Sequence, residues 1–249
     1  MSNTDTGRLR ALGVALAAAI LGLFVAFVLG AVIILPLGFV GIELSALTLL
    51  VISLITGQGI AFGGTALLYL RLRGLGRRYI GMRIPSLRDA IAAVSGYLLA
   101  FVGLLVGTAL VALTQVETAQ NQVAQIATQN PEVLLLLIPA SFVLIGPGEE
   151  LLFRGVVQGR IREAFGPVPG VLLASAIFAA IHFTALTGGV GGRLATIGVL
   201  FFPSLVFGAA YEFTDNLVVP AFIHGAYNAT LFTLLYIFLK TGGMPAGAV

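Results

Sequence analysis

Cysteine is absent from the 249 residues, and charged residues make up only 9% of them. Without cysteine the chain can form no disulfide, thiol nucleophile or thiolate metal site, and it offers no cysteine for lipid attachment. Soluble globular domains have about a quarter of their residues charged, so the composition excludes that class. The net charge is only +3, and the arginines cluster between apolar runs, which indicates membrane topology rather than nucleic-acid binding.

Hydrophobic residues make up 59% of the chain, and the mean hydropathy is +1.08. The apolar runs are long and continuous, whereas a membrane β-barrel would show short alternating segments. The sequence therefore predicts an all-α, polytopic transmembrane helix bundle with about seven spans, in a range of six to eight. The expected spans are residues 11–35, 44–70, 91–113, 132–161, 171–186, 194–211 and 217–239.

Prolines, glycines and one polar stretch define the expected ends of these spans. Pro36 is expected to end the first span, which is too long for a signal peptide and lacks a small-residue cleavage site. Residues 114–131 form a polar loop, and the Gly-Pro-Val-Pro-Gly stretch at 166–170 predicts a turn. Glycines flanking Gln58 in the second span permit a kink or a close helix contact.

Charge asymmetry predicts the orientation. Six arginines lie between the second and third spans, at Arg71, Arg73, Arg77, Arg78, Arg83 and Arg88. The positive-inside rule assigns this segment, and with it the N-terminus, to the cytoplasm, and seven spans then place the C-terminus outside. No transporter-like repeat is present. We interpret residues 1–249 as a single transmembrane domain, with a motif-bearing catalytic core at 132–239 and accessory N-terminal spans at 1–131.

Two adjacent glutamates lie in the middle of the fourth expected span. Ionisable groups at membrane depth are costly, so Glu149, Glu150 and Arg154 predict a functional site. Glu150 and Arg154 are four residues apart and can pair on one helical face. Glu149 points about 100° away from Glu150 and is left free for chemistry. A structural ion-pair cluster at a helix end is the alternative interpretation of this segment.

The chain contains two histidines, and both fall in expected spans. A hairpin about the 166–170 turn would bring His182 to the level of Glu149. The last span enters from the same side and carries His224 and Asn228 on one face, four residues apart. Each histidine alone could be a packing residue, but their convergence on the acidic pair predicts one catalytic or ligand site in the cytoplasm-facing half of the membrane.

Several catalytic schemes lack their residues. There is no Gly-x-Ser-x-Gly elbow and no His-Glu-x-x-His motif, and Asp5, Asp89 and Asp215 all lie in polar stretches. Seryl, diaspartyl and metalloprotease-motif chemistry is therefore unsupported, and water activation by the glutamate and histidine set remains.

In this hypothesis Glu149, helped by His182, takes a proton from water as general base. His224 and Asn228 donate hydrogen bonds to the oxyanion, an effect worth roughly 3–4 kcal/mol per donor in comparable sites. Glu150, paired with Arg154, orients the wall of the site. Phe178, one turn before His182, packs against the imidazole or lines the substrate path, with plain core packing as the alternative.

These motifs resemble the signature of the CPBP family, which comprises type II CAAX prenyl endopeptidases and related bacteriocin-processing and self-immunity proteins. The family pattern is Glu-Glu-x-x-x-Arg, then Phe-x-x-x-His, then His-x-x-x-Asn/Asp. The sequence supplies all three in order, at Glu149, Glu150, Arg154, Phe178, His182, His224 and Asn228. The motifs cover about 80 residues, and their combination is specific where any one alone is weak.

The resemblance implies an intramembrane protease whose cavity opens to the cytoplasm and admits the C-terminus of a peptide or protein. In the prenyl-processing members this substrate loses three residues after a lipid-bearing cysteine. The family pattern assigns water activation to Glu149 and His182, and oxyanion stabilisation to His224 and Asn228. The implied partners are the bilayer and a peptide substrate with or without a prenyl group. Some members are thought to act as immunity or scaffold proteins.

Two other functions remain open. A zinc protease of the same fold would use Glu149, His182 and His224 as ligands, although Asn228 is a poor zinc ligand and favours a site without cofactor. A transporter or binding scaffold would use the polar cavity to hold a ligand. The missing repeat and the single concentrated site argue against transport.

Overall fold

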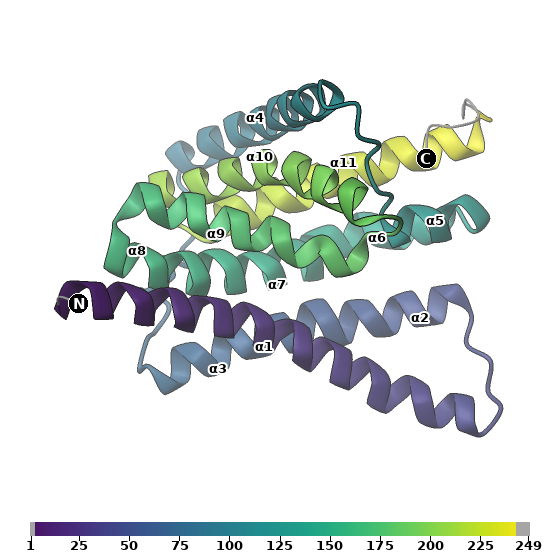
Figure 1. The fold of residues 1–249 in the computed structure, drawn as a ribbon, viewed down its shortest axis with the longest axis horizontal. Coiled ribbons are helices and arrows are strands. Elements are labelled where there is room, and N and C mark those ends of the chain that lie inside the picture. Colours follow the sequence, from purple (N-terminus) through teal and green to yellow (C-terminus); the bar gives the residue numbers. More distant parts are fainter. Residues whose placement is uncertain (1–2, 243–249) are drawn as a thin grey trace.

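The computed structural model describes residues 3–242 as a bundle of helices (Figure 1). Seven helical segments in this range are long and apolar enough to cross a membrane, which confirms the predicted class of fold. In chain order the elements are α1 (Asn3–Phe39), α2 (Ala46–Ser53), the π-helix η1 (Leu54–Gly63), α3 (Gly64–Leu72), α4 (Leu87–Ala112), α5 (Gln122–Gln129), α6 (Val133–Ala140), the π-helix η2 (Ser141–Ile145), α7 (Gly146–Glu150), the π-helix η3 (Leu151–Gln158), α8 (Gly159–Phe165), α9 (Pro167–Ile181), the 3₁₀ helix η4 (His182–Ala185), α10 (Val190–Thr214) and α11 (Val218–Lys240).

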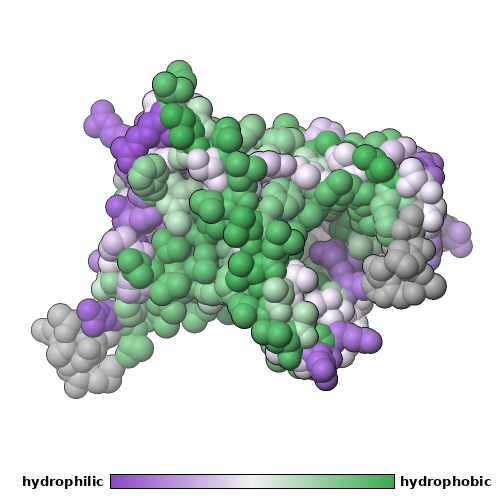
Figure 2. Space-filling view, turned by 90° about the horizontal axis from the view of Figure 1, so that it is seen from above, coloured by the Kyte–Doolittle hydropathy of each residue, from purple (hydrophilic) through white to green (hydrophobic). Residues whose placement is uncertain are grey.

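Two spans are composite. The second span joins α2, η1 and α3, and the fourth runs without a break from α6 to α8. The N-terminal end of α1, α8 and the end of α3 lie at one end of the bundle, and α5 lies at the other (Figure 1). Apolar side chains cover the middle of the face in Figure 2, and hydrophilic ones gather toward its ends.

Three predicted boundaries are wrong. Helix α1 continues past Pro36 to Phe39, because a proline in the last turn removes only one backbone hydrogen bond and the Pro36 carbonyl still accepts from Val40. The turn at 166–170 shrinks to Gly166, with φ of 86°, and Pro167 begins α9, where its missing N–H is not needed. The loop 114–131 contains α5, whose first turn is capped by Asn121.

The segment between α3 and α4 is docked onto the bundle. Ile80 is buried against Gly155 of η3, and the Tyr79 hydroxyl donates to Glu163 of α8 at 2.8 Å. Arg83 pairs with Asp89, which is buried in the first turn of α4. The arginine-rich segment therefore has a fixed position at the same end of the bundle as α8.

Glycine allows the fourth span and α11 to touch backbone to backbone. A Cβ atom added at Gly146 would lie 2.6 Å from the Ala221 carbonyl oxygen. A Cβ added at Gly225 would lie 2.8 Å from the Ser141 carbonyl oxygen. Only glycine fits this approach, and it brings the acidic pair of the fourth span beside His224.

We expect Gly225→Ala to force these two backbones apart and to lower the free energy of unfolding by about 1–3 kcal/mol. Thermal unfolding of the purified protein in detergent measures this. Gly30→Ala is the matched control, since a Cβ at this α1 position meets nothing within 4 Å. Equal melting temperatures for the two variants would contradict the close approach.

Candidate active site

The acidic pair lies where three π-helical segments meet. Helix α7 is five residues long and is bounded by η2 and η3, and η1 of the second span packs against it. Glu149 is the middle residue of the fourth span, Val133–Phe165. π-Helical turns are rare and occur often at functional sites, so this local geometry makes α7 the candidate functional part of the span.

Glu150 is completely buried and uses both of its carboxylate oxygens. Its Oε2 accepts from Nε of Arg154 at 2.8 Å, which is the i, i+4 pair that the spacing predicts. Its Oε1 accepts from Nδ1 of His224 at 2.9 Å. The second bond was not predicted, and it joins the fourth span to α11.

Arg154 is also completely buried, and its remaining nitrogens reach two further helices. One guanidinium nitrogen lies 3.4 Å from the Ser175 hydroxyl of α9, and another donates to the Ser204 hydroxyl of α10 at 2.9 Å. Its Cζ lies 5.1 Å from the ring centroid of Phe178. Sequence reasoning missed both serines, although hydroxyl groups inside apolar spans were an available signal.

His224 is held between aromatic rings. Its imidazole stacks on Phe207 at 4.8 Å between centroids and meets the edge of Phe178 at 5.7 Å. Because Nδ1 is bonded to Glu150, the free ring nitrogen Nε2 is the one that faces Glu149, at 3.9 Å from its Oε2. Phe207 was missed because nothing in its sequence context distinguishes it from core residues.

Glu149 contrasts with its neighbour. It is only 5% exposed, and its Oε2 is a buried atom without a hydrogen-bond partner among residues 3–242. A buried carboxylate oxygen without a partner is rare in folded proteins and calls for a functional explanation. One glutamate is thus held and the other is available, as the helical geometry predicts.

His182 lies at the end of α9, half-buried, one ring away from this cluster. Its Nδ1 lies 2.8 Å from the Phe178 carbonyl oxygen, so in the neutral ring Nδ1–H donates and Nε2 is left as an acceptor. Its ring centroid lies 4.9 Å from that of Phe178. No hydrogen bond or ion pair joins His182 to Glu149 in the described part of the chain, and Phe178 forms the link between the two histidines.

Asn228 follows His224 by one turn of α11 and is half-buried. Its side chain makes no hydrogen bond with other residues of the described range, so the carboxamide is free to bind a ligand. The structure thus brings Glu149, Glu150, Arg154, Phe178 and His224 into contact, with His182 and Asn228 at the edge of this set.

The three zinc ligands of the alternative hypothesis, Glu149, His182 and His224, do not come together around one point. Among residues 3–242 no group of three or more acidic or histidine side chains is placed so that it could hold a metal ion. Glu149 and His224 approach each other, whereas His182 contacts the set through the ring of Phe178. The residues present therefore do not fit a three-ligand zinc centre.

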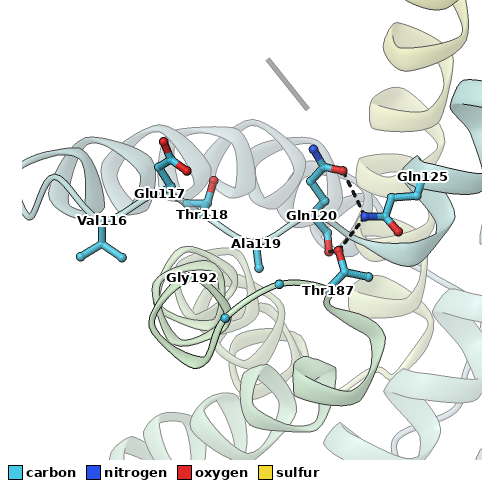
Figure 3. Close-up of a pocket in the computed structure, with 10 residues that line it drawn as sticks. Val116, Glu117, Thr118, Ala119, Gln120, Gln125, Thr187 and Gly192 are labelled. Carbon is cyan, nitrogen blue, oxygen red and sulfur yellow. Dashed lines mark hydrogen bonds between the residues drawn. The ribbon is translucent and has the colours of Figure 1, made fainter. Parts of the chain in front are cut away.

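A pocket of about 690 Å³ lies elsewhere, between the loop after α4 and the start of α10 (Figure 3). None of the predicted site residues lines it. Its polar side chains bond to one another, with Gln125 donating to Thr187 at 2.8 Å and to Gln120 at 3.3 Å. Its one ionisable side chain is Glu117, and no histidine, arginine or second carboxylate joins it in the lining, so the pocket lacks the set of groups that the acidic pair has around it.

We expect Arg154→Leu to leave Glu150 as an uncompensated buried charge and to cost about 3–5 kcal/mol in the free energy of unfolding. Lys240→Gln, which breaks the exposed pair with Glu132, is the control and should change stability little. Thermal unfolding in detergent compares the two variants. A melting temperature for Arg154→Leu equal to that of the wild type would show that the pair does not support the fold.

Comparison with known proteins gives a match to a family model. Residues 131–230 match the family model of the type II CAAX prenyl endopeptidase Rce1-like proteins. No curated protein and no solved structure matches the chain. The matched region begins just before α6, ends inside α11 and contains every residue of the three predicted motifs. The seven apolar helices indicate an integral multi-pass membrane protein, and over residues 131–230 this protein is similar to the Rce1-like family of type II CAAX prenyl endopeptidases.

Proposed function

We propose that the protein is an intramembrane endopeptidase that hydrolyses a peptide bond near the C-terminus of a peptide or protein, with or without a prenyl group. The observation that supports this function best is the contrast within the acidic pair. Glu150 is fully hydrogen-bonded, while Glu149 keeps a buried, unpartnered oxygen beside His224. A desolvated carboxylate with a free lone pair is suited to accept a proton from water.

The reaction starts when Glu149 takes one proton from a water molecule. The water oxygen then bonds to the scissile carbonyl carbon, and the carbonyl electron pair moves to the oxygen, which becomes an oxyanion. His182 assists through Nε2, because its Nδ1 is engaged with the Phe178 carbonyl. In the second half the C–N bond breaks, and the proton held by Glu149 passes to the leaving amine.

The oxyanion is stabilised by α11. Glu150 fixes the ring of His224 so that Nε2, when it carries a proton, donates toward the reacting carbonyl. The carboxamide of Asn228, one turn further along, donates the second hydrogen bond. Arg154 keeps Glu150 in place and neutralises its charge, so Glu150 and Arg154 act as positioning residues.

The arginine-rich segment at 71–88 is assigned to the cytoplasmic side in this proposal, together with the N-terminus. The site then opens toward the cytoplasm, where a C-terminal peptide would enter. A prenyl group on that peptide would lie in the bilayer.

Glu149→Gln keeps the shape of the side chain and removes the base. We expect this variant to melt like the wild type and to lose cleavage by roughly 10²–10⁴-fold, the usual contribution of a positioned base. Mass spectrometry of prenylated and plain peptides incubated with each protein measures the products. Glu117→Gln in the loop after α4 is the control and should cleave normally. Full activity of Glu149→Gln would remove Glu149 from the mechanism.

Metal dependence separates this proposal from a zinc protease. Because the donor set for zinc does not assemble, we expect cleavage to persist in a strong chelator. Elemental analysis of the purified protein accompanies the assay. Stoichiometric zinc whose removal abolishes cleavage would establish the zinc mechanism instead.

A further inference from the structure

The second span passes directly beside the catalytic helix at Gln58. Gly148 precedes Glu149, and a Cβ atom added to it would collide with the Gln58 carbonyl group and lie 3.5 Å from the Gln58 Cα. The backbones of η1 and α7 therefore touch at this point. Gln58 belongs to a part of the chain outside the family match at 131–230.

The register of the two helices turns the Gln58 side chain toward the level of Glu149. Phe62 and Phe153 pack edge to face, with ring centroids 5.9 Å apart. Phe62 follows Gln58 by four residues, and Phe153 follows Glu149 by four residues. Residues four apart share a helical face, so the contact between the two phenylalanines, together with the approach of Gly148 to Gln58, places Gln58 and Glu149 at the same level one turn earlier.

Both side chains end in an unpaired acceptor. Oε1 of Gln58 and Oε2 of Glu149 are buried, and neither has a hydrogen-bond partner in residues 3–242. An amide oxygen and a carboxylate oxygen cannot satisfy each other, because both accept. The group that would satisfy both is a molecule with two hydrogens to donate, and water is the smallest such molecule.

We propose that Gln58 and Glu149 form a two-acceptor subsite that holds the attacking water, a role that rests on the peptidase function proposed above. One O–H of the water donates to Glu149 and the other to Gln58, so a lone pair is directed at the scissile carbonyl, and Nε2 of His182 acts on the peptide group rather than on the water. On attack the first proton passes to Glu149, the oxygen bonds to the carbonyl carbon, and the second O–H stays bonded to Gln58. Gln58 is then a catalytic residue contributed by the second span.

The test is Gln58→Leu, which keeps the approximate size of the side chain and removes the acceptor. We expect kcat for a cleaved peptide to fall roughly 10²-fold, as for other losses of reactant positioning, with KM within about twofold of the wild type. The melting temperature should be unchanged or higher, because the substitution removes a buried acceptor that has no partner.

Thr56→Val is the matched control. Thr56 lies two residues earlier in η1 and is also inside the span. Its hydroxyl donates a hydrogen bond to the Ile52 carbonyl of its own helix at 2.7 Å. This variant removes a polar group from the same π-helix on another face, and both kcat and the melting temperature should stay near those of the wild type.

Each outcome decides the question. An unchanged kcat for Gln58→Leu overturns the subsite while leaving the peptidase function intact. A rise in KM at constant kcat would assign Gln58 to substrate binding and overturn its role toward water. A lowered melting temperature that accounts for the lost activity would make Gln58 a structural residue. A wild type that cleaves no peptide overturns the proposed function and the subsite together.

Discussion

The buried carboxylate of Glu150 is the constraint on which the arrangement of the helices depends. A charge at this depth is tolerated only with partners, and Glu150 finds them in Arg154 and His224. Arg154 is buried in turn and needs the hydroxyl groups of Ser175 and Ser204. One ion pair thus ties the fourth span to α9, α10 and α11. This network fixes the rotation of each helix about its axis, which apolar packing alone leaves poorly specified.

The same network explains why Glu149 can stay unpartnered. The backbones of the fourth span and α11 touch at Gly146 and Gly225, and α11 cannot move away without breaking the bond from His224 to Glu150. The cost of an unsatisfied oxygen on Glu149 is therefore carried by the surrounding structure. Glu149, the proposed base, and Glu150, which holds the helices together, are neighbours in sequence but have opposite hydrogen-bonding states.

Long apolar runs and helical spacing sufficed to predict the seven spans and the pair between Glu150 and Arg154. They could not predict the bond from Glu150 to His224, because a hairpin argument sets the level of a residue and says nothing about rotation about the helix axis. The same gap explains why Phe178, and not Glu149, is the direct neighbour of His182. The π-helical segments carry no composition signal, and contacts between distant spans are invisible in any single window of sequence.

The first two spans share a wall with the acidic pair. Phe62 packs on Phe153, and a Cβ at Gly22 of α1 would lie 2.9 Å from Leu152. The accessory role of residues 1–131 remains a prediction. These contacts show that the first two spans pack directly against the helix that carries the acidic pair. Gly148 lacks a side chain where the Gln58 carbonyl needs the room, so the fourth span could not adopt this path beside a differently placed second span. Substitutions in η1 should therefore shift the position of Glu149 even when they contact no motif residue.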